Sequence, residues 1–180
     1  MGQVRNVVLV GFMGTGKSAI GGRLAKAVSF RFFDTDHLIE ERAGKKITDL
    51  FSEFGETRFR EIEMEVIRDV MRGEHLVVST GGGAVIRKEN RDFFSQNGTV
   101  VYLSARHDII LSRAQRRPGQ RPLLQGGDPG ATIKRLMQER APLYQDVADF
   151  SLDTSDMSIE AAVFKIKEMV FRGAMDASQG

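Results

Sequence analysis

The chain has 180 residues, enough for one compact domain and short for two. Its formal net charge is only +2, so the composition does not indicate a polybasic protein that binds nucleic acid. There is no cysteine, which excludes disulfide bonds, a thiolate nucleophile and a cysteine metal site.

Short apolar runs alternate along the chain with longer amphipathic stretches. We predict strands at Val7–Val10, Phe32–Phe33, Leu76–Val78, Val100–Leu103 and Phe150–Leu152. Helices are predicted at about 17–28, 56–72, 88–96, 106–114, 131–141 and 158–171. Strands separated by helices require parallel crossovers, which predicts a three-layer α/β sandwich with a central five-stranded parallel sheet.

The first apolar run, Val7–Val10, is soon interrupted by glycine. It therefore predicts a buried strand and not a signal peptide or a membrane span. On this basis we expect a cytoplasmic protein with no membrane partner.

A glycine-rich turn follows the first predicted strand and precedes a helix. Residues 11–18 read GFMGTGKS and match the pattern G-x-x-x-x-G-K-[ST]. Its glycines let successive backbone N–H groups point at oxyanions, and the start of the helix adds its positive dipole end. In such a loop Lys17 reaches the β- and γ-phosphates and the Ser18 hydroxyl ligates Mg²⁺. An accidental glycine-rich turn would lack the flanking strand and helix, so the pattern indicates a nucleotide site.

Two carboxylates, Asp34 and Asp36, end the second predicted strand. Residues two apart in an extended chain point to the same side, so both are expected at one site near the carboxyl ends of the strands. One would support the metal through its water shell, while the other accepts a substrate hydroxyl proton. The alternative is that Asp36 merely caps a helix that begins near His37.

The helix predicted at 56–72 carries charged residues on its apolar side. Arg60 and Glu63 fall inside that apolar arc, where unpaired charge is costly. Either the two form a structural bridge at i,i+3, or Arg60 binds an anionic substrate and Glu63 orients it. Arg140 repeats the pattern in the helix at 131–141. Two inward guanidiniums suit a planar carboxylate, so we favour substrate anchoring.

The third predicted strand ends in three glycines, Gly81–Gly83. Such a run lets bare backbone approach a ligand and offers N–H donors, although a flexible connection is the alternative. Ser79 or Thr80 is a candidate for contact with the metal's waters. This strand end carries no aspartate at the usual Walker-B place, so we expect Asp34 to take over part of that duty.

Glycine, proline and arginine are concentrated in residues 116–130, and all four prolines lie between 118 and 142. This composition predicts an exposed loop. The loop is either a surface connection with solvated arginines or a lid that closes over phosphates.

The motifs GFMGTGKS, FDTD, FGETRFREIE, STGGGAV, RPLL and ERAPLY occur in the order and spacing of the shikimate kinase family. The chain resembles that family over essentially its whole length. The resemblance implies a P-loop kinase fold and transfer of the ATP γ-phosphate to the 3-hydroxyl of shikimate, which gives shikimate 3-phosphate and ADP in aromatic amino-acid biosynthesis. It also implies ATP as co-substrate, Mg²⁺ and a monomer.

The resemblance further implies a role for each matched position. The residues that would wrap the phosphates are Gly14, Thr15, Gly16, Lys17, Ser18 and Ala19. Of these, Ser18 would bind Mg²⁺ with support from Asp34, and Lys17 would be catalytic. Arg121, in RPLL, would be a catalytic lid arginine that reaches the ATP phosphates.

For the substrate, the resemblance implies that Asp36 holds the shikimate hydroxyls and acts as base. Arg60 and Arg140 would grip the carboxylate, and Glu63 would brace these arginines. The glycines that would close around the substrate are Gly81, Gly82 and Gly83. The stretch before RPLL differs by one residue from the family pattern, so the arginine that contacts adenine is Arg113, Arg116 or Arg117. The adenine loop at 154–157 is matched by position only.

From these parts we expect a single domain over residues 1–180. Its core would comprise 1–35, 75–110 and 146–172, with a substrate-binding region at 36–72, a lid at about 114–130 and a frayed tail at 173–180.

Two other functions compete with this interpretation. A gluconate kinase would share the sheet and the phosphate loop, and gluconate is also a carboxylate. A noncatalytic nucleotide-binding switch would bind nucleotide tightly but would leave Arg60 and Arg140 unexplained.

Overall fold

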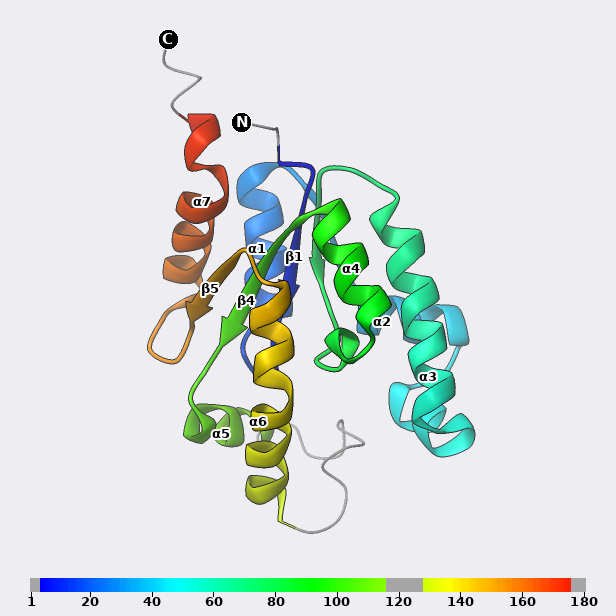
Figure 1. Ribbon diagram of the computed structural model, residues 1–180. Coiled ribbons are helices and arrows are strands. Elements are labelled where there is room, and N and C mark those ends of the chain that lie inside the picture. Colours follow the sequence, from blue (N-terminus) through cyan, green and yellow to red (C-terminus); the bar gives the residue numbers. More distant parts are fainter. Residues whose placement is uncertain (1–3, 116–127, 176–180) are drawn as a thin grey trace.

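In the computed structural model, residues 4–115 and 128–175 are described, and the side chains of 172–175 are not. Five short apolar segments form one parallel sheet with the strand order β2-β3-β1-β4-β5 (Figure 1). Its strands are β1 (Asn6–Val10), β2 (Arg31–Asp34), β3 (Leu76–Ser79), β4 (Thr99–Ser104) and β5 (Phe150–Asp153). The predicted fold class and all five strands are confirmed.

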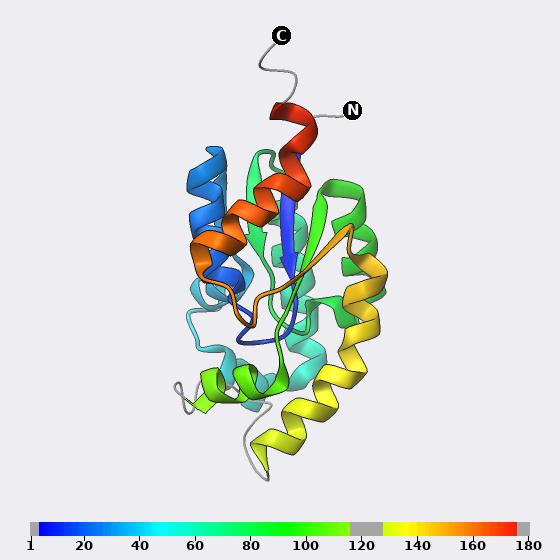
Figure 2. The ribbon, with the colours of Figure 1, turned by 90° about the vertical axis from the view of Figure 1, so that its left-hand side faces the viewer.

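Helices cover both faces of the sheet, because alternate residues of the central strand β1 are apolar and buried on each side. Val7 and Leu9 pack against α1 (Lys17–Val28) and α7 (Ile159–Met175). On the other face, Val8 and Val10 belong to a cluster with α3 (Ile47–Met71), α4 (Lys88–Asn97), α5 (His107–Gln115) and α6 (Pro129–Val147). Figure 2 shows α1 and α7 on one side of the strands and α4 and α6 on the other.

The strand register brings the carboxyl ends of neighbouring strands to one level. Leu9 of β1 pairs with Ser79 of β3, and Ser79 pairs with Asp34 of β2. Two further elements, α2 (Thr35–Ala43) and the 3₁₀ turn η1 (Ala84–Ile86), begin just beyond those ends. Polar residues that follow different strands are therefore gathered at one edge of the sheet.

The structure corrects the helix predictions in the region after β2. The helix α2 was expected only as an alternative, beginning near His37, and the stretch Ile47–Phe54 was not predicted as helix at all. Both are helical, and Ile39, Leu50 and Phe59 bury a small separate core between α2 and α3. Gly55 interrupts α3 with non-helical backbone angles, φ 75° and ψ 173°. The helical segment after this break begins at residue 56, as predicted.

The predicted helix 131–141 is also longer in the structure. It runs from Pro129 to Val147 and continues through Pro142, which sequence reasoning takes as a breaker. The helix α7 continues to Met175 and so includes part of the tail expected to fray, while 176–180 lie outside the described residues. Of the expected lid, 116–127 lie outside the described residues as well. No helix among those described is both long and apolar enough to cross a membrane.

Candidate active site

A cavity of about 1030 Å³ opens at the carboxyl ends of the strands. Most of the predicted site residues that the structure describes line it: Gly14, Thr15, Gly16, Lys17, Ser18, Ala19, Asp34, Asp36, Arg60, Glu63, Thr80, Gly81, Gly82, Gly83, Arg113 and Arg140. Ser79 does not line it. Arg116, Arg117 and Arg121 lie outside the described residues.

The phosphate loop depends on glycines with backbone angles that other residues rarely adopt. Gly11, Gly14 and Gly16 have φ of 144°, 81° and 95°. A Cβ atom at Gly11 would lie 2.2 Å from Leu103 O, so the loop also packs against β4 too closely for a side chain. Lys17 Nζ donates to Gly11 O at 2.8 Å and Phe12 O at 2.9 Å, which holds the ammonium group inside the loop.

The first turn of α1 meets the end of β2 through Ser18 and Asp34. Ser18 Oγ donates to Asp34 Oδ2 at 2.5 Å and lies 3.4 Å from Ser79 Oγ. Thr80, the other candidate at the end of β3, instead donates its hydroxyl to Leu9 O at 3.1 Å. Two hydroxyls and one carboxylate oxygen therefore face one another, and these are hard oxygen donors of the kind that Mg²⁺ prefers.

The two aspartates after β2 have different conformations. Asp34 is the N-cap of α2 and accepts from Asp36 N at 3.1 Å, whereas Asp36 itself lies in the first helical turn. The expectation that both belong to an extended chain is therefore wrong, and so is the alternative that Asp36 is the cap. Both side chains nevertheless line the cavity.

The pKa of Asp36 is raised from 3.8 to about 7. Burial is the main cause, and the negative charges of Asp34 and Glu63 add to it; Lys17 and Arg60 act in the opposite direction. A carboxylate with a pKa near neutrality is suited to accept a proton.

Arg60 makes the ion pair that the sequence suggested and also lines the cavity. Its Nη1 lies 2.8 Å from Glu63 Oε2, and its Nη2 lies 3.0 Å from Glu56 Oε1. The guanidinium also stands over the ring of Phe59, 5.1 Å from its centre. The two alternatives, structural bridge and inward-facing cation, are thus not exclusive.

Glu63 is fully buried beside Arg60. Burial raises the pKa of the Glu63 carboxyl, although the charge of Arg60 opposes this. Its second oxygen, Oε1, has no hydrogen-bond partner among the described residues. Because an unsatisfied buried acceptor is costly, this oxygen is a candidate to accept from a bound ligand.

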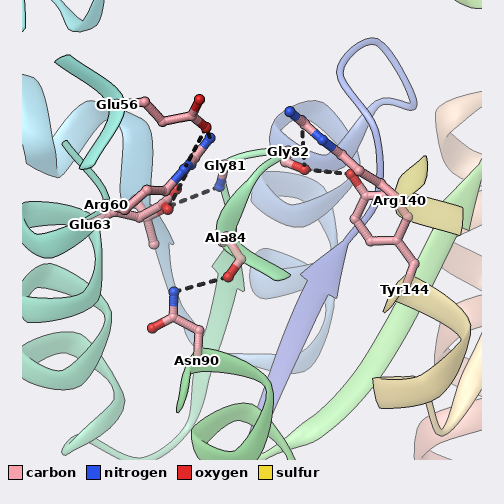
Figure 3. Close-up of polar contacts among 10 residues, drawn as sticks. Glu56, Arg60, Glu63, Gly81, Gly82, Ala84, Asn90, Arg140 and Tyr144 are labelled. Carbon is pink, nitrogen blue, oxygen red and sulfur yellow. Dashed lines mark hydrogen bonds and ion pairs between the residues drawn. The ribbon is translucent and has the colours of Figure 1, made fainter. Parts of the chain in front are cut away.

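Arg140 enters the cavity from α6, opposite Arg60 (Figure 3). Its Nη1 lies 3.3 Å from Gly82 O, and its guanidinium stands 5.9 Å from the ring centre of Phe12. Figure 3 shows the two arginines on either side of Gly81 and Gly82. An anion placed over this glycine turn would meet a guanidinium from each side.

The glycine turn is held by side chains and is not a loose connection. Gly81 N donates to Thr35 Oγ1 at 3.1 Å, and Asn90 Nδ2 donates to Ala84 O at 2.9 Å. A Cβ atom at Gly83 would lie 2.1 Å from Arg60 Nη2. The absence of a side chain at Gly83 is therefore what allows the arginine to lie against the turn.

Comparison with known proteins identifies the family to which the chain belongs. The family model for shikimate kinase matches residues 13–171. The chain belongs to the shikimate kinase family. Its members transfer the γ-phosphate of ATP to the 3-hydroxyl of shikimate, and the chain is an ATP-dependent kinase.

Individual relatives agree with this membership. The chain is 47% identical over 146 residues to shikimate kinase from Burkholderia lata, covering 81% of this chain and 78% of that one. It is 43% identical over 149 residues to the enzyme from Thermodesulfovibrio yellowstonii, with 83% and 85% covered. A solved shikimate kinase from Acinetobacter baumannii in complex with shikimate superposes with a TM-score of 0.91 and 36% identity, covering 95% of each chain. Membership in this family decides against the gluconate kinase alternative.

On the nucleotide side of this shikimate kinase fold, two long-range contacts hold the phosphate loop. Arg113 Nη1 donates to Gly14 O at 2.7 Å, and Thr154 Oγ1 donates to Thr15 O at 2.9 Å. Thr154 Oγ1 also lies 2.9 Å from Ser104 O, so it joins the end of β4 to the loop. Of the three arginines considered for adenine, Arg113 is the one that the structure describes, and it lines the cavity.

One wall of the cavity lies in the predicted substrate-binding region 36–72, but none of its residues was predicted individually. The residues of α2 and of the start of α3 that line it are His37, Glu40, Lys46, Ile47, Thr48 and Phe51. A usable signal existed, because Ile47, Leu50, Phe51 and Phe54 are spaced i, i+3, i+4 and i+7, which is typical of an amphipathic helix.

Proposed function

We propose that the chain phosphorylates shikimate in the described cavity, with shikimate bound over the glycine turn and ATP bound along the phosphate loop. The single observation that carries this assignment is the placement of Arg60 and Arg140 on either side of Gly81 and Gly82, in the same cavity as Lys17. The arrangement offers one anion site for a carboxylate and a second for a triphosphate.

The phosphate loop would position the γ-phosphate. Its backbone N–H groups and Lys17 would bind the phosphate oxygens, and Ser18 with Asp34 would hold Mg²⁺. A site with few protein oxygen donors fits Mg²⁺, which takes its remaining ligands from phosphates and water. Among the described residues, no group of three or more His, Cys, Asp or Glu side chains is placed to bind a metal ion by itself. When bound, the ion neutralises charge on the β- and γ-phosphate oxygens.

The carboxylate of shikimate would be held by Arg60 and Arg140. Arg60 is kept in place by Glu63 at 2.8 Å, so we assign Glu63 the task of orienting this arginine. The substrate approaches bare backbone at Gly81, where a Cβ atom would lie 2.6 Å from Asp36 Oδ1. A guanidinium binds a planar carboxylate through two parallel hydrogen bonds, which fixes the ring as well as the charge.

Asp36 would hold the substrate hydroxyls and accept the proton of the 3-hydroxyl. Its pKa of about 7 allows it to be ionised at neutral pH and to take up the proton as the oxygen–phosphorus bond forms. Transfer then requires the hydroxyl to be in line with the γ-phosphorus, and orientation by the two arginines supplies that geometry.

We assign the remaining charge stabilisation to Arg121, which lies outside the described residues. Its role as a lid arginine would be to reach the transferring phosphoryl group when the segment at about 114–130 closes. We assign adenine contact to Arg113, since it already lies in the cavity beside Gly14.

We propose that the chain works as one domain, with its core at 1–35, 75–110 and 146–172 and its substrate-binding region at 36–72. We further propose that it acts as a monomer in the cytoplasm. The described residues that line the cavity all belong to one chain, which supports this proposal. Gel filtration with light scattering would test the oligomeric state.

The experiment that tests the function is ADP release from MgATP, measured with shikimate, with gluconate and with neither. We expect shikimate to raise the rate at least a hundredfold over the rate without acceptor, and gluconate to leave it unchanged. Equal stimulation by gluconate would contradict the substrate assignment. Tight ATP binding without stimulation by either compound would favour a nucleotide-binding switch.

A further inference from the structure

The carbonyl of Gly82 accepts hydrogen bonds from two side chains of α6. Tyr144 Oη donates to Gly82 O, and Arg140 Nη1 donates to the same oxygen at 3.3 Å (Figure 3). Arg140 and Tyr144 are four residues apart, so they lie on the same face of the helix. This pairing exists because α6 continues through Pro142.

Tyr144 is more firmly fixed than a surface tyrosine. Its side chain is 1% exposed, and its ring stacks on Tyr102 of β4 with the ring centres 5.0 Å apart and the planes at 18°. Burial raises the pKa of the Tyr144 hydroxyl, which therefore stays protonated and able to donate. The ring position and the hydrogen bond together define one orientation for the hydroxyl.

Gly82 in turn lies against the phosphate loop. A Cβ atom at Gly82 would stand 3.3 Å from Met13 N and 3.6 Å from Gly11 O. A shift of the Gly82 peptide would therefore displace atoms of both the glycine turn and the phosphate loop. Through its hydrogen bonds to the Gly82 carbonyl, α6 contacts both segments.

The two arginines of the cavity are supported very differently. Arg60 has ion pairs with Glu56 and Glu63, whereas Arg140 makes no ion pair with any described residue. Arg140 is instead held by the 3.3 Å contact with Gly82 O, by the ring of Phe12 and by its interaction with the Tyr144 hydroxyl. The position of its guanidinium therefore depends on where the Gly82 carbonyl is held.

We propose that Tyr144 is a positioning residue for substrate binding: by fixing the Gly82 carbonyl it sets the place of the Arg140 guanidinium. Tyr144 itself does not line the large cavity, so it acts through Gly82 and Arg140 and not by touching the substrate. The inference rests on the proposed function, because the group that Arg140 receives there is the shikimate carboxylate. No assignment drawn from the sequence included this tyrosine.

The test is Tyr144→Phe, which keeps the stacked ring and removes only the hydroxyl. Loss of one hydrogen bond of ordinary strength corresponds to about a five- to tenfold effect, which we expect as a rise in the KM for shikimate. The KM for ATP should stay within about twofold and kcat within about threefold. A merely structural role would alter both KM values together, or lower the melting temperature and leave both KM values unchanged; either result would overturn the proposal.

Tyr102→Phe is the matched control. It removes the hydroxyl of the stacking partner, which makes no hydrogen bond with a described residue, and it should leave both KM values unchanged. If Tyr144→Phe does not give folded protein, Tyr102→Leu removes the ring on which Tyr144 rests and should produce the same selective rise in the shikimate KM. A Tyr102→Leu enzyme with an unchanged shikimate KM would then refute the proposal.

A double-mutant cycle with Arg140→Lys tests whether Tyr144 acts through Arg140. In that background we expect Tyr144→Phe to change kcat/KM for shikimate by less than twofold, whereas full additivity of the two substitutions would contradict the mechanism. Absence of shikimate-stimulated ADP release in the unaltered protein would refute the proposed function. An active protein that tolerates Tyr144→Phe would refute only this inference.

Discussion

Asp34 divides its two carboxylate oxygens between Ser18 and the first turn of α2. Oδ2 accepts from Ser18 Oγ at 2.5 Å, while Oδ1 accepts from the backbone N–H of Asp36 at 3.1 Å. One residue therefore fixes the end of β2 against the start of α1 and also caps the helix that carries Asp36. Asp36 is therefore not needed as the helix cap. The contact between Ser18 and Asp34 is the reason that we propose these two residues as metal ligands.

Ser18→Ala removes the hydroxyl from this pair. We expect the Mg²⁺ concentration for half-maximal activity to rise at least tenfold and kcat to fall, because one of the two proposed protein ligands is lost. Titration of activity with Mg²⁺ at saturating ATP and shikimate measures both. Ser95→Ala, on α4, removes an exposed hydroxyl that bonds only to Arg91 O and serves as the control. An unaltered Mg²⁺ dependence in Ser18→Ala would exclude the metal assignment.

The activity should depend on pH through Asp36. Since the proposed base must be ionised to accept a proton and the pKa of Asp36 is about 7, kcat/KM should fall as the pH drops below about 7 and level off above it. Asp36→Asn should lower turnover by about 10²- to 10⁴-fold and remove this dependence, with ATP affinity preserved. Steady-state rates between pH 5.5 and 9, with ATP binding by calorimetry, provide the comparison. Loss of ATP binding in Asp36→Asn would point to a structural role instead.

The same group makes a prediction about stability. Its pKa in the folded protein is raised from 3.8 to about 7, so the folded state binds the proton more tightly than the unfolded state does. The contribution of Asp36 to stability is therefore most favourable below about pH 4 and is lost as the pH rises towards 7. The full shift corresponds to an upper bound of about 4 kcal/mol.

Asp36→Asn should thus stabilise the protein at pH 8, by about 1 kcal/mol or more, and have a much smaller effect at pH 4.5. Thermal unfolding of both proteins at the two pH values, without ligands, gives the difference in melting temperature. Asp92→Asn, which alters an exposed carboxylate on α4, is the matched control. Equal effects of Asp36→Asn at both pH values would argue against a raised pKa of Asp36 in the folded protein.

Sequence reasoning found the fold and most of the cavity because the decisive signals are local. The strand before GFMGTGKS, the amphipathic helix after it and the charges at Arg60 and Arg140 each depend on a short stretch of chain. Parallel topology then places the strand ends together without further information. For these reasons the predicted five-stranded sheet and the residues gathered in the cavity agree with the structure.

The features that escaped prediction depend on tertiary contacts. Pro142 signals a helix end, yet α6 continues past it and packs Tyr144 on Tyr102. Asp36 is helical because Asp34 provides the cap, and two aspartates in D-x-D are both plausible caps until the structure selects one. No local pattern announces that a tyrosine hydroxyl on α6 reaches the carbonyl of Gly82.

Gly83 gives a sharp test of the close approach to Arg60. Its φ is −102°, so alanine is tolerated by the backbone, but the added Cβ would stand 2.1 Å from Arg60 Nη2. Gly83→Ala should therefore displace the guanidinium and raise the KM for shikimate at least tenfold, with little change in the KM for ATP. Kinetics with each substrate varied in turn measure this.

Gly22→Ala, in α1, is the control for Gly83→Ala. The nearest atom to its added Cβ is Phe32 Cδ1 at 3.9 Å, and alanine favours a helix by up to about 1 kcal/mol over glycine. This variant should keep both KM values and should be as stable as the unaltered protein or more so. A Gly83→Ala enzyme with normal shikimate kinetics would show that the contact with Arg60 is unimportant for binding.

The proposed binding of a substrate carboxylate between Arg60 and Arg140 can be tested with the methyl ester of shikimate, which lacks the negative charge. The experiment compares kcat/KM for shikimate with that for the ester in the unaltered protein, in Arg140→Lys and in Arg135→Lys. Arg135 lies on the same helix with its side chain 62% exposed, paired with Glu139. We predict that the unaltered protein and Arg135→Lys prefer the free acid by about a hundredfold or more, and that Arg140→Lys loses most of this preference. An ester phosphorylated as efficiently as shikimate by the unaltered protein would contradict the claim.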